Sequence, residues 1–542
     1  MEKLGKRPWN DVYGVDLERD FIIPECSLYE LFADRVEKHR YQTALVYNEN
    51  LISYAELKDR VDRLAGAWSE LGVKKRERIG LMVSNHPSYI YAYYAAQKLG
   101  ATVVQMNPMY TPREIGSIAK EVDIRHIVTE SCNVNKLKSV SKVHGFQNLF
   151  IADDQFEDYL SEHRLTNLIH QGDAASAVEA SISPKEDTAV IQFTGGTTGK
   201  MKGAMLTHYN LVANVIQSRF MYGEGMKPGE EVTLTCTPLY HVYAMTSGMN
   251  LSIYLGAKNI IVPKFEIERV LELIRKYRPT FFPGVPTMYN AFINHPDVEE
   301  YGLDCLKFCS SGSAPLPVEV IHRFEKMTGA IIGEGYGMSE TSPSTHRNPT
   351  KGVRKVGSIG IPFPGTDSKV VDGEGVELPP GSVGELVIKG PQVMKGYWGN
   401  PEETKKALRN GWLFTGDLAS MDEDGYFYIV GRKKELIISG GFNVYPQEVE
   451  GVLYDHPAVK EAAAIGFPDE YSGERVKAFV VLKNSVSVTS EELREFCYER
   501  LTRYKVPKEI EIRDELPRNT VGKLLKRKLV EEEKQKRTIG GK

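Results

Sequence analysis

The chain has 542 residues, too many for a single compact core, so two or more domains are expected. Its hydrophobic and charged fractions, 41% and 26%, are typical of an ordinary globular protein. The formal net charge of −4, from 68 basic and 72 acidic residues, excludes a global positive field that would recruit nucleic acid or anionic lipid. Neither a signal peptide nor a transmembrane run is evident, so we expect a cytoplasmic protein.

Alternating strand and helix patterns fill the first part of the chain. Helical periodicity marks residues 27–39 and 53–71, and apolar runs alternate with helical stretches as far as residue 327. This order predicts an α/β architecture. After Gly357 the pattern changes to short β-rich runs between Gly, Pro and Asp turns, which predict a small barrel-like or distorted antiparallel unit. These runs are residues 367–371, 384–389 and 426–430.

A compact α+β segment is expected beyond Lys434. Its predicted helices are residues 446–454 and 490–501, and its predicted strands are residues 462–466 and 477–482. We place the domain boundary at residues 432–434. This gives a large N-terminal domain, residues 1–433, and a small mobile C-terminal domain, residues 434–542.

A glycine- and threonine-rich loop, residues 194–203, follows a predicted strand at residues 188–193. Glycines let the backbone turn so that its N–H groups approach anionic oxygens, the threonine hydroxyls add donors, and Lys202 adds charge. The loop fails the Walker A pattern, because Lys200 is followed by Met201 and not by Ser or Thr. A flexible surface loop is the alternative interpretation. The strand before it and Lys202 after it favour a polyphosphate site.

Further motifs follow this loop in a fixed order. They are Ser311-Gly312-Ser313-Ala314-Pro315, Tyr336-Gly337-Met338-Ser339-Glu340-Thr341, Thr415-Gly416-Asp417, Gly431-Arg432-Lys433-Lys434, Gly440-Gly441 and Pro517-Arg518-Asn519-Thr520-Val521-Gly522-Lys523. With these motifs the chain resembles the adenylate-forming superfamily, which contains acyl-CoA synthetases, firefly-type luciferases and peptide-synthetase adenylation domains. The resemblance covers nearly the whole chain and is greatest to bacterial fatty acyl-CoA synthetases.

The resemblance implies a two-step reaction that uses ATP, Mg²⁺ and CoA. A carboxylate attacks the α-phosphate of ATP to give an acyl-adenylate and pyrophosphate, and the CoA thiol then displaces AMP. Both steps depend on positioning and charge. The resemblance also implies that the C-terminal domain swings about Lys434, with Gly440 and Gly441 lining the CoA channel. A tight hairpin turn is the alternative interpretation of the two glycines.

The implied ATP site draws on most of these motifs. The β- and γ-phosphates would be held by Thr194, Gly195, Gly196, Thr197, Thr198, Gly199 and Lys202. The base, the acyl pocket and the approach to the phosphates would be bordered by Gly312, Ser313, Ala314, Pro315, Glu334, Gly335, Gly337 and Ser339. Tyr336 would stack on adenine, and Asp417 would accept hydrogen bonds from the ribose hydroxyls with Arg432 assisting.

The implied catalytic groups lie in two of the motifs. Ser339 and Glu340 face the phosphates, and Glu340 is the expected Mg²⁺ ligand together with Thr194. Without the other motifs, Ser339 and Glu340 would be read as a helix cap or a solvated turn. Lys523 would bridge the substrate carboxylate and the α-phosphate, where its charge offsets the repulsion between two anions. By composition alone, Lys523 would be one more solvated lysine.

The acyl end of the site is expected at residues 238–248, where His241 would orient the carboxylate or gate the pocket. A satisfied core histidine is the alternative. Amino-acid-activating relatives have an aspartate at the next position, and this chain has Val242, so an amino-acid substrate is not expected. An apolar acyl wall is expected from His241, Tyr243, Met245 and Val285, with further methionines nearby.

The function that these residues and the resemblance favour is an ATP-dependent fatty acid:CoA ligase. The alternatives are an aryl- or cinnamoyl-CoA ligase, an enzyme that loads a carrier protein, and a luciferase-like oxygenase. A non-catalytic nucleotide- or lipid-binding protein is the alternative of another class. No nucleic-acid partner or transmembrane segment is expected. The sequence does not decide between a monomer and a homodimer, or whether the protein contacts a membrane peripherally.

Overall fold

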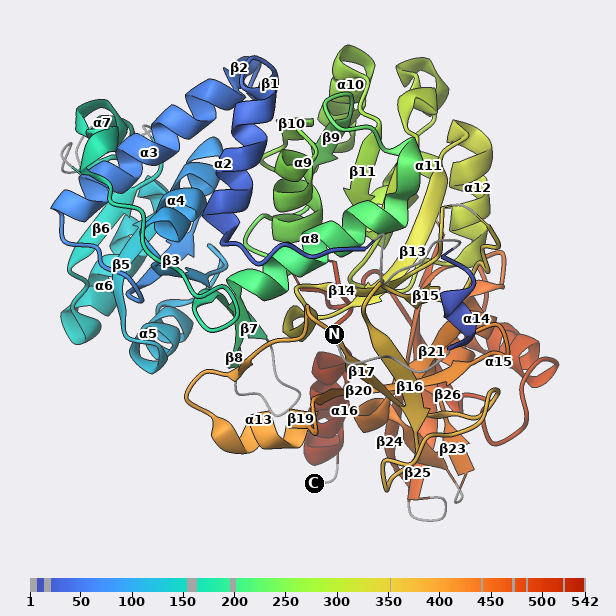
Figure 1. Ribbon diagram of the computed structural model, residues 1–542. Helices are drawn as coiled ribbons and strands as arrows, with labels where there is room; N and C mark the ends of the chain where they lie inside the picture. The colour runs from blue at the N-terminus through green and yellow to red at the C-terminus, as the bar shows by residue number, and fades with distance from the viewer. Residues whose placement is uncertain are drawn as a thin grey trace.

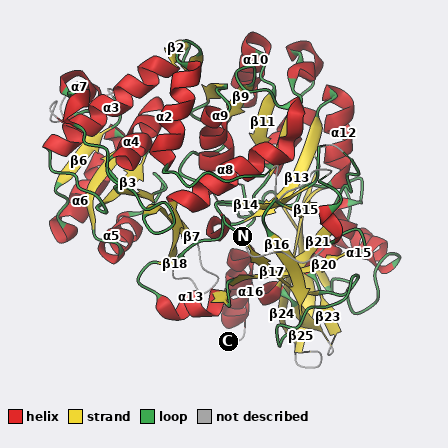
Figure 2. Cartoon of the chain, viewed as in Figure 1, coloured by secondary structure: helices red, strands yellow, loops and turns green. Residues whose placement is uncertain are grey.

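The structure is a computed structural model that describes residues 7–13, 21–153, 163–194, 201–350, 352–439, 442–469, 473–483, 486–519 and 522–540. It is a mixed α/β protein with a large N-terminal part and a small C-terminal part, as the sequence predicts (Figure 1). Helices surround and separate the sheets of the large part (Figure 2). Within the described ranges, no helix combines the length and apolar character that crossing a membrane requires.

The first sheet has seven strands: β3 (Arg78–Met82), β4 (Thr102–Gln105), β5 (Ile124–Thr129), β6 (Asn148–Ile151), β7 (Thr188–Thr194), β8 (Lys202–Thr207) and β18 (Gly396–Tyr397). Their order is β18-β8-β7-β4-β3-β5-β6, and the five from β7 to β6 are parallel. Helices α3 (Tyr54–Glu70) and α4 (Pro87–Lys98) cover one face, and α5 (Pro112–Glu121) and α6 (Val134–His144) cover the other. A short helix, α7 (Leu165–Gln171), packs on α3. This layering is typical of parallel sheets.

The second sheet has nine strands: β1 (Thr43–Tyr47), β2 (Asn50–Ser53), β9 (Val232–Thr235), β10 (Lys258–Ile261), β11 (Phe281–Gly284), β12 (Phe308–Ser311), β13 (Ile331–Gly337), β14 (Ser344–Arg347) and β15 (Ile361–Pro362). Their order is β15-β14-β13-β12-β11-β9-β10-β1-β2. One face packs against α10 (Ile267–Tyr277), α11 (Pro286–Ile293) and α12 (Val318–Thr328). The other packs against α2 (Leu28–His39), α8 (His208–Tyr222) and α9 (Leu251–Tyr254), in a core shared with the first sheet.

Two predicted N-terminal helices form because their first turns are capped. Ser27 precedes α2 and accepts a hydrogen bond from the backbone N–H of Glu30, whose carboxylate accepts from the backbone N–H of Ser27. Ser53 and Glu56 make the same reciprocal pair at the start of α3. Each reciprocal pair satisfies two backbone N–H donors that the helix itself leaves unpaired. The helices predicted at residues 27–39 and 53–71 are therefore confirmed.

The β-rich region predicted after Gly357 is a third sheet of five strands: β16 (Asp367–Val371), β17 (Gly384–Lys389), β19 (Leu408–Arg409), β20 (Trp412–Met421) and β21 (Phe427–Arg432). It is antiparallel, with the order β16-β17-β20-β19 and with β21 on β20. The pairings among the described residues do not close it into a barrel. Helix α13 (Pro401–Ala407) precedes β19 and packs on β18 and β20.

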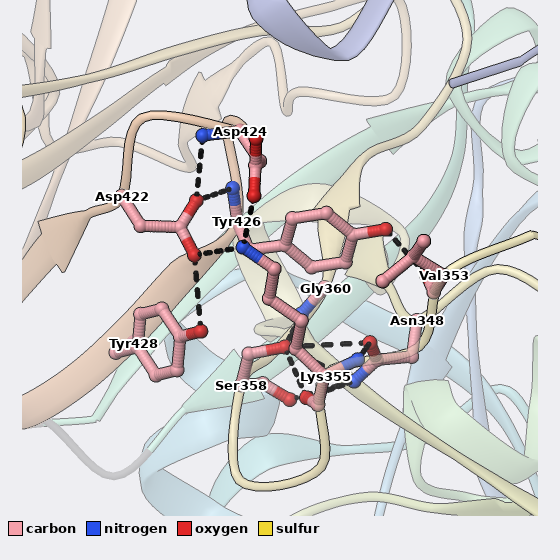
Figure 3. A network of polar contacts seen from close by, with 9 residues as sticks. All are labelled: Asn348, Val353, Lys355, Ser358, Gly360, Asp422, Asp424, Tyr426 and Tyr428. Atoms are coloured by element: carbon pink, nitrogen blue, oxygen red, sulfur yellow. Dashed lines mark hydrogen bonds and ion pairs between the residues drawn. The ribbon is translucent and has the colours of Figure 1, made fainter.

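A polar network holds the β20–β21 hairpin against the loop that follows β14 (Figure 3). The ammonium of Lys355 lies 2.6 Å from Asp422 and 2.7 Å from Asp424, both in the turn of the hairpin. Tyr428 donates a hydrogen bond of 3.1 Å to Asp422, and Asn348 donates one of 3.2 Å to the carbonyl of Lys355. The hairpin carries two of the predicted ATP-site residues, so this network fixes their distance from the second sheet.

The C-terminal part has a fourth sheet: β22 (Ile437–Ser439), β23 (Phe442–Val444), β24 (Val459–Asp469), β25 (Gly473–Leu482) and β26 (Glu509–Arg513). Its order is β23-β22-β25-β24, with β26 parallel to β25. Helices α14 (Pro446–Tyr454) and α15 (Ser490–Tyr498) contribute to one core, and α16 (Lys526–Gly540) packs through Leu529 into the other. The predicted α+β segment is confirmed. Its boundary at residues 432–434 falls at a short turn between β21 and β22 and stays a prediction.

Candidate active site

The predicted ribose group, Asp417, sits where β20 and β21 pair, directly across from Arg432. Its carboxylate is buried, 4% exposed, and lies 2.9 Å from Nε of Arg432. The hydroxyl of Tyr336, from the end of β13, donates to the other carboxylate oxygen at 2.5 Å. Gly416 turns the strand just before Asp417, at φ +73°, and its N–H donates to Glu385. The structure therefore brings Tyr336, Asp417 and Arg432 together from two separate sheets.

The turn at residues 311–315 follows β12, beside the carboxyl end of β13. Ser313 has a left-handed φ of +70°, which makes the turn sharp. Ala314 and Pro315 follow it toward α12, and Gly335 and Gly337 flank the predicted adenine-stacking residue on β13.

Glu334 precedes this stretch of β13 and has an unusual carboxyl. Burial raises the pKa of Glu334 to about 7, although the N–H of Gly357 donates a hydrogen bond of 2.9 Å to it. A strongly raised carboxyl pKa often marks a binding region. From the sequence, Glu334 was expected only to border the base and the acyl pocket, and no local pattern indicated that its carboxyl would titrate near neutral pH.

At the phosphate end, Glu340 lies in a short turn, Ser339–Thr341, that begins with Ser339. Its carboxylate is 6% exposed, and one of its oxygens accepts a hydrogen bond of 2.8 Å from Tyr397. Burial raises the pKa of Glu340, so the carboxylate lacks full charge compensation from its surroundings. Such a group suits a hard cation. Mg²⁺ usually needs only one or two protein carboxylates, because phosphates and water supply its other ligands.

The glycine-rich loop leaves β7 at Thr194 and returns into β8 at Lys202, and these two residues pair across the strands. The ammonium of Lys202 forms an ion pair with Glu403 of α13 and lies 5.1 Å from the centre of the Tyr397 ring. The predicted phosphate residues Gly195, Gly196, Thr197, Thr198 and Gly199 lie outside the described residues. Tyr397 and Glu403 were missed by sequence reasoning, since the pairing of β18 with β8 brings Tyr397 to the site and the packing of α13 on β18 brings Glu403.

The C-terminal part delivers Lys523 to this site. Gly522, at φ +75°, turns the chain just before Lys523 and lies against Thr287 at the start of α11. Lys523 keeps part of its side chain exposed, but the protein around its ammonium lowers its pKa, and Arg432 lowers it further. Asp417, the next charge that acts on it, has the opposite effect. The lysine of the C-terminal part therefore sits among the ATP-site charges of the N-terminal part.

The predicted acyl residues occupy the neighbouring interior. Burial lowers the pKa of His241 to about 4, with a smaller contribution from Lys523, and the N–H of Tyr243 donates to Nδ1 of His241 at 3.3 Å. The hydroxyl of Tyr243 lies 2.8 Å from that of Ser310 on β12. The Tyr243 ring packs against Gly312, where a side chain would approach within 3.1 Å of it.

The other two predicted acyl residues have different surroundings. Met245 is buried, and its sulfur accepts a hydrogen bond of 3.0 Å from Gln105 of β4. Val285 lines a cavity of about 270 Å³ between the N-terminal part and Arg518, Asn519 and Gly522 of the C-terminal part. Phe265 and Met288 also line this cavity, which is mainly apolar.

The predicted hinge residue, Lys434, lies in the turn Lys433–Glu435 between the third and fourth sheets. The predicted CoA-channel glycines, Gly440 and Gly441, lie outside the described residues. Among the residues that are described, no group of three or more His, Cys, Asp or Glu side chains is arranged to hold a metal ion by itself. A cation bound at Glu340 would therefore take its remaining ligands from the substrate phosphates and from water.

Comparisons with known proteins agree over most of the chain. The family model described as AMP-binding enzyme matches residues 32–398, and the model described as AMP-binding enzyme C-terminal domain matches residues 448–523. A long-chain-fatty-acid–CoA ligase of Bacillus subtilis (strain 168) is 40% identical over 558 aligned positions, covering 98% of this chain and 99% of that protein.

Solved structures match the fold of this chain over more than nine tenths of its length. The ATP-bound RpMatB-BxBclM chimera B3 matches with a TM-score of 0.86 and 32% identity, over 94% of this chain and 99% of that one. The anthranilate CoA ligase AuaEII, solved in complex with anthranoyl-AMP, matches with a TM-score of 0.88 and 26% identity, over 97% of this chain and 100% of that one.

Proposed function

Because this chain belongs to the AMP-binding enzyme family, we propose that it joins a long-chain fatty acid to CoA while ATP is converted to AMP and pyrophosphate. One observation carries the proposal. The charged side chains that the two steps require come from distant parts of the sequence and meet around Lys523. The charges of Arg432, Asp417 and Glu340 all act on the pKa of its ammonium. Such convergence is the arrangement that charge stabilisation at a reacting phosphate needs.

In the first step, an oxygen of the fatty acid carboxylate attacks the α-phosphorus, and the bond between this phosphorus and the α,β-bridging oxygen breaks. Lys523 offsets the repulsion between the two anions and the charge that develops as they react. His241 remains neutral near pH 7, because its pKa is about 4, so its contribution is a hydrogen bond and not a charge. Asp417 and Arg432 hold the ribose end of the nucleotide, beside Tyr336.

The pyrophosphate that leaves is held by Lys202 and by the loop that joins β7 to β8. Glu340 fits a Mg²⁺ ligand, since it is a buried carboxylate with an incompletely compensated charge, and Thr194 is the second expected ligand. When bound, Mg²⁺ supplies positive charge to the phosphates. Ser339 precedes Glu340 in the same short turn, which supports a role for its hydroxyl as a further donor to these phosphates.

In the second step, the CoA sulfur attacks the acyl carbon, the bond to the AMP oxygen breaks, and the thiol proton is released. A C-terminal domain beginning at residue 434 rotates between the steps, with Lys434 as the hinge and Gly440 and Gly441 along the CoA channel. The small number of residues between β21 and β22 supports a hinge there, because few backbone angles need to change.

The acid is proposed to be aliphatic because the walls around Val285 are apolar and flexible, with Met288 and Phe265 beside it. Val242 is buried and provides no carboxylate for a substrate ammonium, which disfavours an amino acid. Tyr243 also suits an aryl acid, so the aryl-CoA ligase is the alternative that the test must separate.

The test is a panel of fatty acids of increasing length, together with benzoate and a cinnamate. AMP release is measured with MgATP, with and without CoA. We expect release that requires both the acid and CoA and is fastest with long-chain fatty acids. Release that is equally fast without CoA, or a wild-type protein that shows no acid-dependent exchange of pyrophosphate into ATP, would contradict the assignment.

A further inference from the structure

Tyr397 touches both groups that are expected to hold the leaving pyrophosphate. Its hydroxyl donates a hydrogen bond of 2.8 Å to Glu340, and its ring centre lies 5.1 Å from the ammonium of Lys202. One side chain thus contacts the expected metal ligand at one end and the expected phosphate ligand on its face. None of the motifs that mark the site in the sequence contains Tyr397.

The backbone around Tyr397 is fixed from three sides. Tyr397 pairs with Ala204 of β8, two positions after Lys202, so the ring and the lysine belong to adjacent strands. The N–H of Tyr397 donates to Thr404 of α13 at 2.9 Å. The N–H of Met394, just before β18, donates to the backbone carbonyl of Glu340 at 2.8 Å. The segment that carries Tyr397 is therefore attached to both partners through the backbone as well as the side chain.

Both partners need such support for physical reasons. A buried carboxylate with one fixed hydrogen bond keeps one orientation, whereas a carboxylate without it would turn to find another donor. A lysine has a flexible stem, and an aromatic face beneath its ammonium restricts where the charge lies. Glu403, on the neighbouring helix, gives Lys202 a counter-charge on its other side.

Tyr397 is 9% exposed, so its hydroxyl is mostly shielded from water. A hydrogen bond in this setting is worth more than one at the surface, and its loss removes the side-chain donor of a buried carboxylate. The hydrogen bond to Glu340 and the ring contact with Lys202 each restrict one side chain of the expected phosphate site, and such restriction is what a binding site needs to hold its ligand.

We propose that Tyr397 is a positioning residue that holds the carboxylate of Glu340 and the ammonium of Lys202 in a fixed relation, so that magnesium-bound pyrophosphate is gripped by both. The proposal rests on the proposed function, since Glu340 and Lys202 have these roles only in a ligase that releases pyrophosphate. In this role Tyr397 acts through Glu340 and Lys202, the two side chains that it contacts.

The test measures binding, so it needs no turnover. The nucleotide is α,β-methylene-ATP, whose α,β-bond this reaction does not cleave, and its binding to the full-length protein is followed by calorimetry over a range of Mg²⁺ concentrations and in EDTA. Tyr397→Phe keeps the ring and removes the hydroxyl, and Tyr397→Leu removes both. Tyr29→Phe is the control, because Tyr29 also donates to a buried carboxylate, Asp62, away from the site.

We expect Tyr397→Phe to raise the Mg²⁺ concentration for half-saturation roughly tenfold, while nucleotide affinity in EDTA stays unchanged. Tyr397→Leu should also weaken binding in EDTA, because Lys202 loses its aromatic support. In a Glu340→Gln background, Tyr397→Phe should have no further effect on the Mg²⁺ dependence, since the residue acts through that carboxylate.

A Tyr397→Phe protein whose Mg²⁺ dependence matches that of Tyr29→Phe would overturn the proposal. An equal loss of affinity with Mg²⁺ and in EDTA would also overturn it, because that result indicates general disruption of the site. If Tyr397→Leu does not fold, Tyr397→Phe alone and in the Glu340→Gln background still tests the proposal. A wild-type protein without acid-dependent pyrophosphate exchange would instead contradict the proposed function, and the two failures are therefore distinct.

Discussion

The raised pKa of Glu334 makes the stability of this protein depend on pH in a predictable direction. Burial lifts the pKa of this carboxyl from its ordinary value of 4.5 to about 7. Between these values the folded protein binds more protons at this position than the unfolded chain does. The free energy of unfolding contributed by Glu334 is therefore fully present below about pH 4.5 and is lost as the pH rises to about 7.

The difference between the two pKa values corresponds to about 3.5 kcal/mol, at roughly 1.4 kcal/mol for each pH unit. Glu334→Gln removes the ionisation but keeps an oxygen that can accept the hydrogen bond from Gly357. We therefore expect the variant to be about as stable as the parent near pH 4.5 and up to about 3.5 kcal/mol more stable near pH 8. The gain comes from not having to ionise a partly buried carboxyl.

The assay is urea unfolding of both proteins across this pH range, with the transition of the large N-terminal part followed by fluorescence. Glu319→Gln, an exposed position on α12, controls for the loss of one negative charge. Stability curves of parent and Glu334→Gln that stay parallel from about pH 4.5 to about pH 8 would refute the reasoning. A gain for the variant at low pH would refute it as well, because the sign would then be reversed.

Three further predictions concern the site. Because the pKa of His241 is about 4, the imidazole should not titrate near pH 6.5, and the pH profiles of kcat/KM for the acid should show no inflection there that is present in the parent and absent in His241→Gln. Such an inflection would contradict a neutral imidazole. Gly522→Ala should slow acyl-AMP formation roughly tenfold in single-turnover assays, because φ of Gly522 is +75° and the new methyl group would approach Thr287 to 3.3 Å. An unchanged rate would show that this turn tolerates a side chain. Asp417→Asn should weaken ATP binding in calorimetry by roughly tenfold or more, because it leaves Arg432 without its carboxylate, and unaltered affinity would argue against the ribose role.

The sequence predicted the architecture well wherever local patterns determine it. Strand β7 was expected at residues 188–193 and spans Thr188–Thr194, and α14 was expected and found at Pro446–Tyr454. Both elements combine a clear apolar pattern with a definite start or stop signal. The helix expected at residues 490–501 ends at Tyr498, because helix ends depend on tertiary contacts that the periodicity does not record.

For the site as well, residues in local motifs were predicted, and residues brought there only by the fold were not. Asp417 and Arg432 could be named from their motifs, and the structure adds that they face each other across two paired strands. Tyr397 could not be named, since it lies in a two-residue strand whose partner, β8, is far away in the sequence. The protonation behaviour of Glu334 is equally invisible to a pattern, because burial of a carboxyl is a property of the assembled fold.

In the proposed mechanism, Lys523 serves the adenylation step alone. The decisive measurement compares two rates for Lys523→Ala: acyl-AMP formation from fatty acid and MgATP, and acyl-CoA formation from supplied acyl-AMP and CoA. We predict that the first rate falls by about a thousandfold, because a preorganised charge at the reacting phosphate is lost, while the second stays within a few-fold of the parent rate. An equal loss in both half-reactions would contradict the account.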